Sequence, residues 1–150
     1  MEERQQEPAI RFFARHNHLM TVILLLAIFI AATAVALNGQ SGSVSAEMDD
    51  NWLGVIGPGG APIFVALEEI TQVRLADAVD FGKRLEGEEA KTTRSGRYEN
   101  DVFGVYTLCV YPDSAPYIVV TYGEGETLVF NLKKTKQTQE IYEDLTRRSV

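Results

Sequence analysis

The side chains of this sequence best suited to binding chemistry are five basic residues in one short polar stretch. They are Lys83, Arg84, Lys91, Arg94 and Arg97. Ammonium and guanidinium groups in such density hold phosphate and carboxylate groups, so the cluster predicts a site for an anionic head group, a wall polymer or an acidic peptide. A second interpretation, which the local charge pattern favours, stays open. In it the bases form ion pairs with their acidic neighbours, Glu86, Glu88 and Glu89.

The residue inventory argues against nucleophilic catalysis. The chain has two histidines, His16 and His18, and both precede residue 19. A Ser–His or Cys–His pair therefore cannot form within residues 38–150. Cys109 alternates with apolar residues, so we expect it in a core and not as a reactive thiol. Zinc-ligand spacing and a phosphate-binding loop are missing from the sequence. We expect no enzyme, no catalytic residues and no cofactor.

Acidic residues dominate the charge of the chain. The formal net charge is −7, which argues against nucleic acid as a partner. Four oxygen-bearing side chains, those of Glu47, Asp49, Asp50 and Asn51, superficially resemble a calcium site. They lack the D-x-[DN]-x-[DN]-G spacing and a closing glutamate. We therefore expect a solvated acidic segment and no metal site.

An uncharged apolar run covers residues 19–37 (LMTVILLLAIFIAATAVAL). At about 1.5 Å per residue it reaches roughly 28 Å, close to the thickness of a bilayer core. Basic residues precede it, at Arg4, Arg11 and Arg15, and the next one is Arg74. The length of the run predicts a cell-membrane protein with a single span. The distribution of the basic residues predicts a cytoplasmic N-terminus and an extracytoplasmic C-terminal domain. Small residues near its end, at Ala32, Ala34 and Ala36, leave a cleaved signal peptide as the alternative.

The rest of the chain has the pattern of one β-rich domain. Runs of apolar and β-branched residues predict strands. They cover 52–56, 61–67, 70–76, 102–111, 117–122 and 127–132. The polar stretch 77–101 is either a hidden hairpin, with Gly87 and Gly96 as turn candidates, or a functional loop. From Thr135 the period becomes helical, with Thr138, Ile141, Tyr142 and Leu145 on one side, which predicts an amphipathic C-terminal helix.

The stretch from Ile70 to Leu145 resembles bacterial pleckstrin-homology-like domains found beside membrane spans. Several short motifs carry the resemblance. They are Gly82-Lys83-Arg84, Ser95-Gly96-Arg97-Tyr98, Phe103-Gly104-x-Tyr106, Pro116-Tyr117-Ile118-Val119-Val120, Phe130-Asn131 and Tyr142-x-x-Leu145. The resemblance implies a barrel of two nearly orthogonal antiparallel sheets capped by the C-terminal helix. The predicted fold class is thus α+β, mostly β, with a transmembrane helix before the barrel. The expected segments are a stub at 1–18, the span at 19–37, a linker at 38–46 and the domain at 47–150.

We expect a membrane-anchored module that binds and does not catalyse, at the outer face of the bacterial cytoplasmic membrane. Its expected partners are the membrane itself and an anionic ligand, a peptide or a membrane protein. Two alternatives remain. The resemblance extends to bacteriocin-immunity proteins, which implies interception of an antimicrobial peptide. The other alternative is a structural subunit that docks to membrane partners. A peptide could also add as a strand beside the C-terminal helix.

Overall fold

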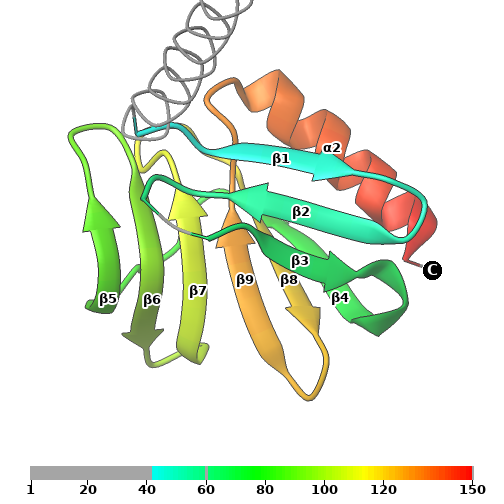
Figure 1. Cartoon of the computed structure of the whole chain (residues 1–150), viewed down its shortest axis with the longest axis horizontal. Helices are drawn as coiled ribbons and strands as arrows, with labels where there is room; N and C mark the ends of the chain where they lie inside the picture. The colour runs from blue at the N-terminus through cyan, green and yellow to red at the C-terminus, as the bar shows by residue number, and fades with distance from the viewer. Residues whose placement is uncertain (1–41, 60, 150) are drawn as a thin grey trace, which may run out of the picture. The chain divides into compact units, whose positions relative to one another are not determined.

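Two β-sheets and one C-terminal helix make up the domain. The structure is a computed structural model that describes residues 42–59 and 61–149. Within these ranges it contains nine strands, a short 3-10 helix (η1, Leu67–Glu69) and the α-helix α2 (Thr135–Arg148). The smaller sheet lies across the larger one, and α2 runs beside it (Figure 1). The expectation of a mostly β domain with two sheets and a C-terminal helix is confirmed.

The smaller sheet is antiparallel, with the order β1-β2-β3. Its strands are β1 (Ser45–Met48), β2 (Trp52–Ile56) and β3 (Ile63–Ala66). Alternation along these strands places Leu53, Val55 and Val65 on the inner face, where they are at most 1% exposed. This face therefore packs into the core, and the opposite face is left toward solvent.

The larger sheet has six strands in the order β4-β8-β9-β7-β6-β5. They are β4 (Ile70–Ala76), β5 (Lys83–Glu89), β6 (Arg94–Asn100), β7 (Gly104–Val110), β8 (Tyr117–Tyr122) and β9 (Glu126–Phe130). β7 and β9 pair in parallel, so the prediction of two purely antiparallel sheets is wrong. In the sheet, β9 lies between β7 and β8. Because β9 runs antiparallel to β8, it has the same direction as β7 and pairs with it in parallel.

Both faces of the larger sheet are buried at its central strands, which explains why β8 and β9 are almost continuously apolar. One face carries Ile118, Leu128 and Phe130, which pack with the inner face of the smaller sheet. The other face carries Val119 and Val129 in a second core. The connection at 77–82 joins the two edge strands β4 and β5, and Val79 and Phe81 within it pack on this second core.

The polar stretch at 77–101 contains a hairpin, one of its two predicted structures. Its turn lies at 90–93, where the Ala90 N–H donates to the Thr93 carbonyl at 2.9 Å. Gly87 and Gly96 are not turn residues, so that expectation is wrong. They lie opposite each other in β5 and β6, with φ of 109° and 132°. A Cβ at Gly96 would collide with the Glu86 carbonyl oxygen, so the two backbones approach where only glycine fits.

Helix α2 packs its apolar stripe against the first core, which is the core between the two sheets. Leu145 and Thr138 are fully buried, and Ile141 and Tyr142 pack against the same core. The predicted amphipathic helix is therefore confirmed.

At the N-terminal side of the domain, Val44 is buried and donates its N–H to the Tyr111 hydroxyl at 3.1 Å. Val44 and the start of β1 thus belong to the folded domain, although we expected them in the linker.

The predicted membrane architecture requires a correction. Among the described residues no helix is long and apolar enough to cross a membrane. α2 has 14 residues and one polar side, and at about 1.5 Å per residue it reaches only roughly 21 Å. A single-pass membrane protein with an extracytoplasmic domain is therefore not supported. The predicted span at 19–37 and the stub before it lie outside the described residues.

Candidate functional site

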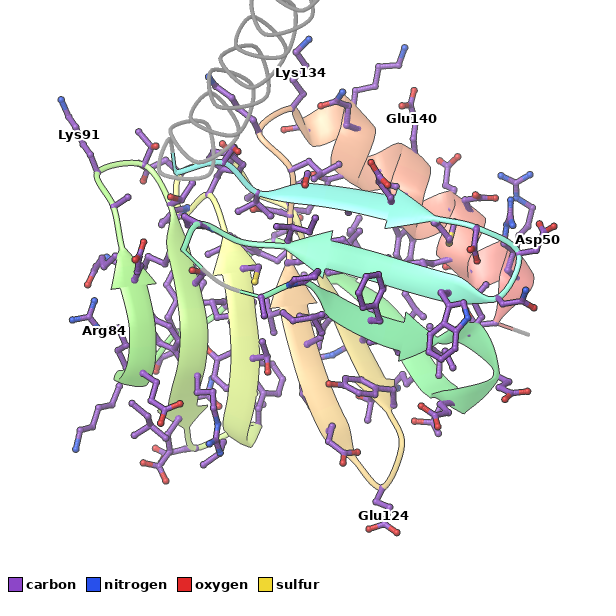
Figure 2. All side chains as sticks on the ribbon, viewed as in Figure 1. Asp50, Arg84, Lys91, Glu124, Lys134 and Glu140 are labelled. Atoms are coloured by element: carbon purple, nitrogen blue, oxygen red, sulfur yellow. The ribbon has the colours of Figure 1, made fainter. Side chains whose placement is uncertain are left out.

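The five predicted basic residues do not converge on one point. All of them lie on the β5–β6 hairpin, but Arg94 and Arg97 are three positions apart in β6 and so face opposite sides of the sheet. Lys91 lies in the turn, while Arg84 projects from β5 away from it (Figure 2). Lys83 has Glu99 as its cross-strand partner, and Arg97 has Glu86. Each base other than Lys91 thus has an acidic side chain in its neighbourhood.

Arg84 and Arg94 are the two predicted residues that the structure brings together. Their common partner is Glu89: its Oε1 lies 2.8 Å from Arg94 Nε, and its Oε2 lies 3.6 Å from Arg84 Nη1. The side chains of all three are between 37% and 45% exposed. The guanidinium of Arg94 also lies 5.5 Å from the centre of the Phe81 ring, on the side of the second core.

The Tyr98 hydroxyl is buried near these three charged groups. Tyr98 is 3% exposed, is paired across the strands with Arg84, and its hydroxyl has no hydrogen-bond partner among the described residues. Burial raises the pKa of this hydroxyl, and the carboxylate of Glu89 raises it further. Tyr98 therefore offers a neutral O–H donor that nothing in the described part of the chain uses.

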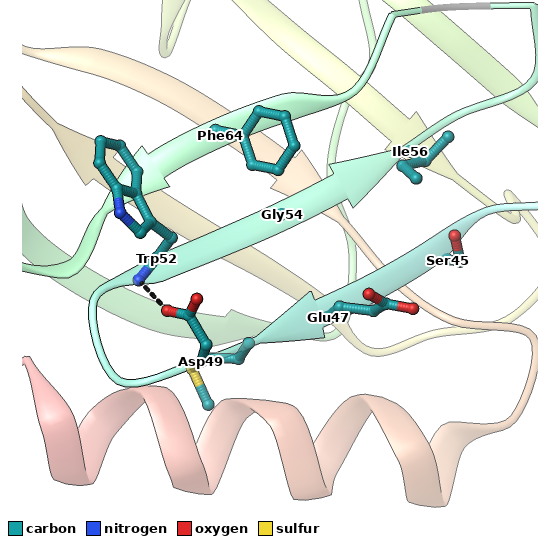
Figure 3. Close-up of a pocket in the computed structure, with 8 residues that line it drawn as sticks. Ser45, Glu47, Asp49, Trp52, Gly54, Ile56 and Phe64 are labelled. Carbon is teal, nitrogen blue, oxygen red and sulfur yellow. Dashed lines mark hydrogen bonds between the residues drawn. The ribbon is translucent and has the colours of Figure 1, made fainter.

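A second candidate site lies on the outer face of the smaller sheet. Trp52, Ile56 and Phe64 are 48%, 45% and 64% exposed and alternate with the buried residues of β2 and β3. We call these three residues the apolar face. Gly54 separates Trp52 from Ile56, and Phe64 lies over it (Figure 3). These residues, together with β1 and Asp49, line a shallow pocket of about 230 Å³.

Carboxylates border the apolar face on the side of β1. Glu47 and Asp49 line the same pocket. Asp49 Oδ1 accepts hydrogen bonds from the N–H groups of Asn51 and Trp52, each at 2.8 Å (Figure 3 shows the second). These bonds, first that of Asn51, lower the pKa of Asp49, and the charge of Arg148 adds to the effect. Asp49 is therefore ionised at neutral pH and anchors the backbone of Trp52.

Arg148 ties the β1–β2 turn to the end of α2. Its Nη1 donates to the Asp49 carbonyl at 3.2 Å and to Asp50 Oδ1 at 3.1 Å. The acidic segment is exposed, as we expected, and two of its residues, Asp49 and Asp50, also shape this turn. Asp49 caps it, and Asp50 binds the helix.

A groove runs between β1 and α2. It has a volume of about 520 Å³ and is lined by apolar and charged side chains. β1 pairs with β2 alone within the described sheet. The predicted addition of a peptide strand beside the helix stays a prediction.

Cys109 has the environment of a core residue. It is 2% exposed, and burial raises the pKa of its thiol to about 12. Across residues 42–59 and 61–149, no group of three or more His, Cys, Asp and Glu residues is placed to hold a metal ion.

No protein-family model, no curated protein and no solved structure matches the chain. The resemblance to pleckstrin-homology-like domains therefore stays a prediction.

The sequence contained a signal for the apolar face that its strand pattern did not resolve. Trp52, Gly54 and Ile56 alternate with Leu53 and Val55. Because all but one of these five are large and apolar, the run indicates a strand without showing which face is buried. The larger sheet decides it, because it packs against the face that carries Leu53 and Val55.

Proposed function

We propose that this domain is a non-catalytic protein-binding module. It uses the apolar face to hold a partner segment that presents apolar side chains flanked by lysine or arginine. The observation that carries the proposal is the exposure of Trp52, Ile56 and Phe64 together on neighbouring strands. Solitary exposed apolar residues are ordinary, but a contiguous aromatic patch with a polar rim is typical of interaction sites.

The composition of the apolar face favours strong binding per residue. Tryptophan and other aromatic side chains dominate the energetics of protein interfaces, because each buries a large area with few rotatable bonds. The face is also held rigidly, since Leu53, Val55 and Val65 anchor the same strands in the core. A rigid surface loses little conformational freedom when a partner binds.

The charge around the apolar face selects the class of partner. Glu47 and Asp49 border the pocket, and Asp50 follows in the same turn. Basic residues on a partner would complement these carboxylates and speed association. A second copy of this chain would bring the same carboxylates against each other, in a chain whose net charge is already −7. A basic partner therefore fits better than self-association.

The same acidic border favours one narrower alternative. A domain that intercepts an antimicrobial peptide needs an apolar surface with negative charges when that peptide is cationic and amphipathic. Loss of the protein should then sensitise cells to one specific peptide and to no other. If the chain is instead a structural subunit, it should co-purify with a fixed partner and loss of the protein should leave sensitivity unchanged.

A display selection with random 16-residue peptides on the full-length chain tests the proposal. We expect enriched peptides to combine Leu, Phe or Trp with Lys or Arg. Binding should fall at least tenfold in the double variant Ile56→Ser/Phe64→Ser, which removes apolar area without touching the core. Val102→Ser is the matched control, since Val102 is 73% exposed in the turn between β6 and β7.

Two results would overturn the proposal. The first is enrichment of acidic peptides, or of peptides that bind the double variant and the parent chain equally. The second is a dimer in sedimentation that Ile56→Ser/Phe64→Ser converts to a monomer, because the apolar face would then serve a second copy of the chain.

A further inference from the structure

A cluster of Arg84, Glu89, Arg94 and Tyr98 lies on the β5–β6 hairpin, on a different sheet from the apolar face. We propose that Arg84, Arg94 and the Tyr98 hydroxyl form a site for a phosphate group, and that the Glu89 carboxylate occupies this site when no ligand is bound. The proposal goes beyond the protein-binding function and does not depend on it, since the two sites share no residue and lie on different sheets.

Glu89 has the geometry of an internal substitute for an anionic ligand. Its two oxygens contact two different arginines, at 2.8 Å on Arg94 and 3.6 Å on Arg84. The longer contact shows that one carboxylate does not satisfy both guanidinium groups equally. Arginine pairs with phosphate as readily as with carboxylate, through two parallel N–H donors.

Three donors favour a phosphate over a carboxylate. Arg84 and Arg94 supply two of them, and the Tyr98 O–H supplies the third, because it has no partner among the described residues. A carboxylate has two oxygens, whereas a phosphate offers three or more. A phosphate in the place of the Glu89 carboxylate could therefore accept from both arginines and from the tyrosine at once.

The surroundings hold these donors in place while letting the ligand enter. Arg94 lies against the ring of Phe81, which packs on the second core and orients the guanidinium. Tyr98 is fixed in the same core. Glu89, in contrast, is the last residue of β5 and its side chain is 43% exposed, so it can swing into solvent when a phosphate competes for the arginines.

The test removes the internal carboxylate and measures phosphate binding by the full-length chain. At low ionic strength, Glu89→Gln should bind inorganic phosphate at least tenfold more tightly than the parent chain, as measured by calorimetry. Phenyl phosphate in a second series shows whether the site prefers a free phosphate or a phosphate ester. Adding Arg94→Gln to Glu89→Gln should abolish the gain, and adding Tyr98→Phe should reduce it several-fold.

Glu88→Gln is the matched control. Glu88 is the neighbour of Glu89, and its cross-strand partner Ser95 faces away from Tyr98, so this variant changes the net charge equally on the other side of the hairpin. The proposal is overturned if Glu88→Gln gains as much affinity as Glu89→Gln. It is also overturned if Glu89→Gln gains none, or if Arg94→Gln leaves the gain intact. None of these results bears on peptide binding by the apolar face, which is measured separately.

Discussion

The ring of Phe64 lies over Gly54, its cross-strand partner in β2. A Cβ built on Gly54 would approach Phe64 Cε1 to 3.2 Å and Cδ1 to 3.4 Å. The absence of a side chain at Gly54 thus lets the aromatic ring rest on the strand between Trp52 and Ile56. An aromatic ring over a strand glycine also shields a weak point of the sheet.

Gly54→Val should separate binding from folding. Gly54 has an ordinary strand conformation, which a β-branched residue suits, so we expect the free energy of unfolding to stay within about 1 kcal/mol of the parent value. The valine should displace the Phe64 ring and weaken peptide binding about tenfold. Denaturant unfolding and a binding titration on the same sample check both parts. A large loss of stability, or unchanged affinity, would contradict the account of the apolar face.

Local sequence patterns predicted most strands well. Trp52–Ile56, Ile70–Ala76 and Tyr117–Tyr122 occur with the predicted bounds, because apolar and β-branched residues lie between clear turn residues. The amphipathic helix was predicted equally well, since Leu145 and its neighbours repeat at helical spacing.

The remaining elements were hidden for physical reasons. β5 is exposed at every residue and β1 carries little apolar surface, so neither shows a buried face in its sequence. Pairing order is a long-range property, and nothing in β7 or β9 signals that they run parallel. The basic cluster failed to converge because Arg94 and Arg97 have odd spacing within β6, a strand that the polar sequence did not reveal.

Asn131→Ala should destabilise the domain strongly. Asn131 is fully buried, accepts from the Tyr111 N–H at 2.7 Å and donates to the carbonyls of Tyr111 and Ser114 at 3.0 and 2.7 Å. Alanine would leave these backbone groups unpaired, and we expect a loss of about 2 to 3 kcal/mol in chemical denaturation. Thr135→Ala serves as the control, because its hydroxyl also donates to a backbone carbonyl but at an exposed position. Similar losses in the two variants would contradict the role of the buried amide.

Gly96→Ala should be costly because two effects combine at this residue. Its φ of 132° disfavours any L side chain, and the added Cβ would collide with the Glu86 carbonyl oxygen. We expect a loss of at least about 2 kcal/mol in the free energy of unfolding. Gly125→Ala isolates the first effect, since Gly125 has a φ of 116° and no atom within 4 Å of the added Cβ. Equal losses in the two variants would show that the β5 and β6 backbones do not approach this closely.

Cys109 should make the domain sensitive to alkali. Burial raises the pKa of its thiol from 9.0 to about 12, so the folded state retains a proton that the unfolded state releases. The contribution of the buried thiol to the free energy of unfolding is therefore complete below about pH 9 and is lost as the pH rises toward 12. Burial likewise raises the pKa of Tyr106 to about 12. In Cys109→Ala, denaturant midpoints should fall less steeply over this range, and an identical slope would contradict the burial of the thiol.

Quenching of tryptophan fluorescence shows whether a bound peptide covers the apolar face. Trp52 is the one tryptophan of the chain, so its emission reports on the apolar face alone. When a selected basic, apolar peptide without tryptophan saturates the full-length chain, we expect a shift of the emission to shorter wavelength and a severalfold drop in quenching by acrylamide. If the bound peptide leaves both the wavelength and the quenching of Trp52 unchanged, the apolar face is not the binding surface.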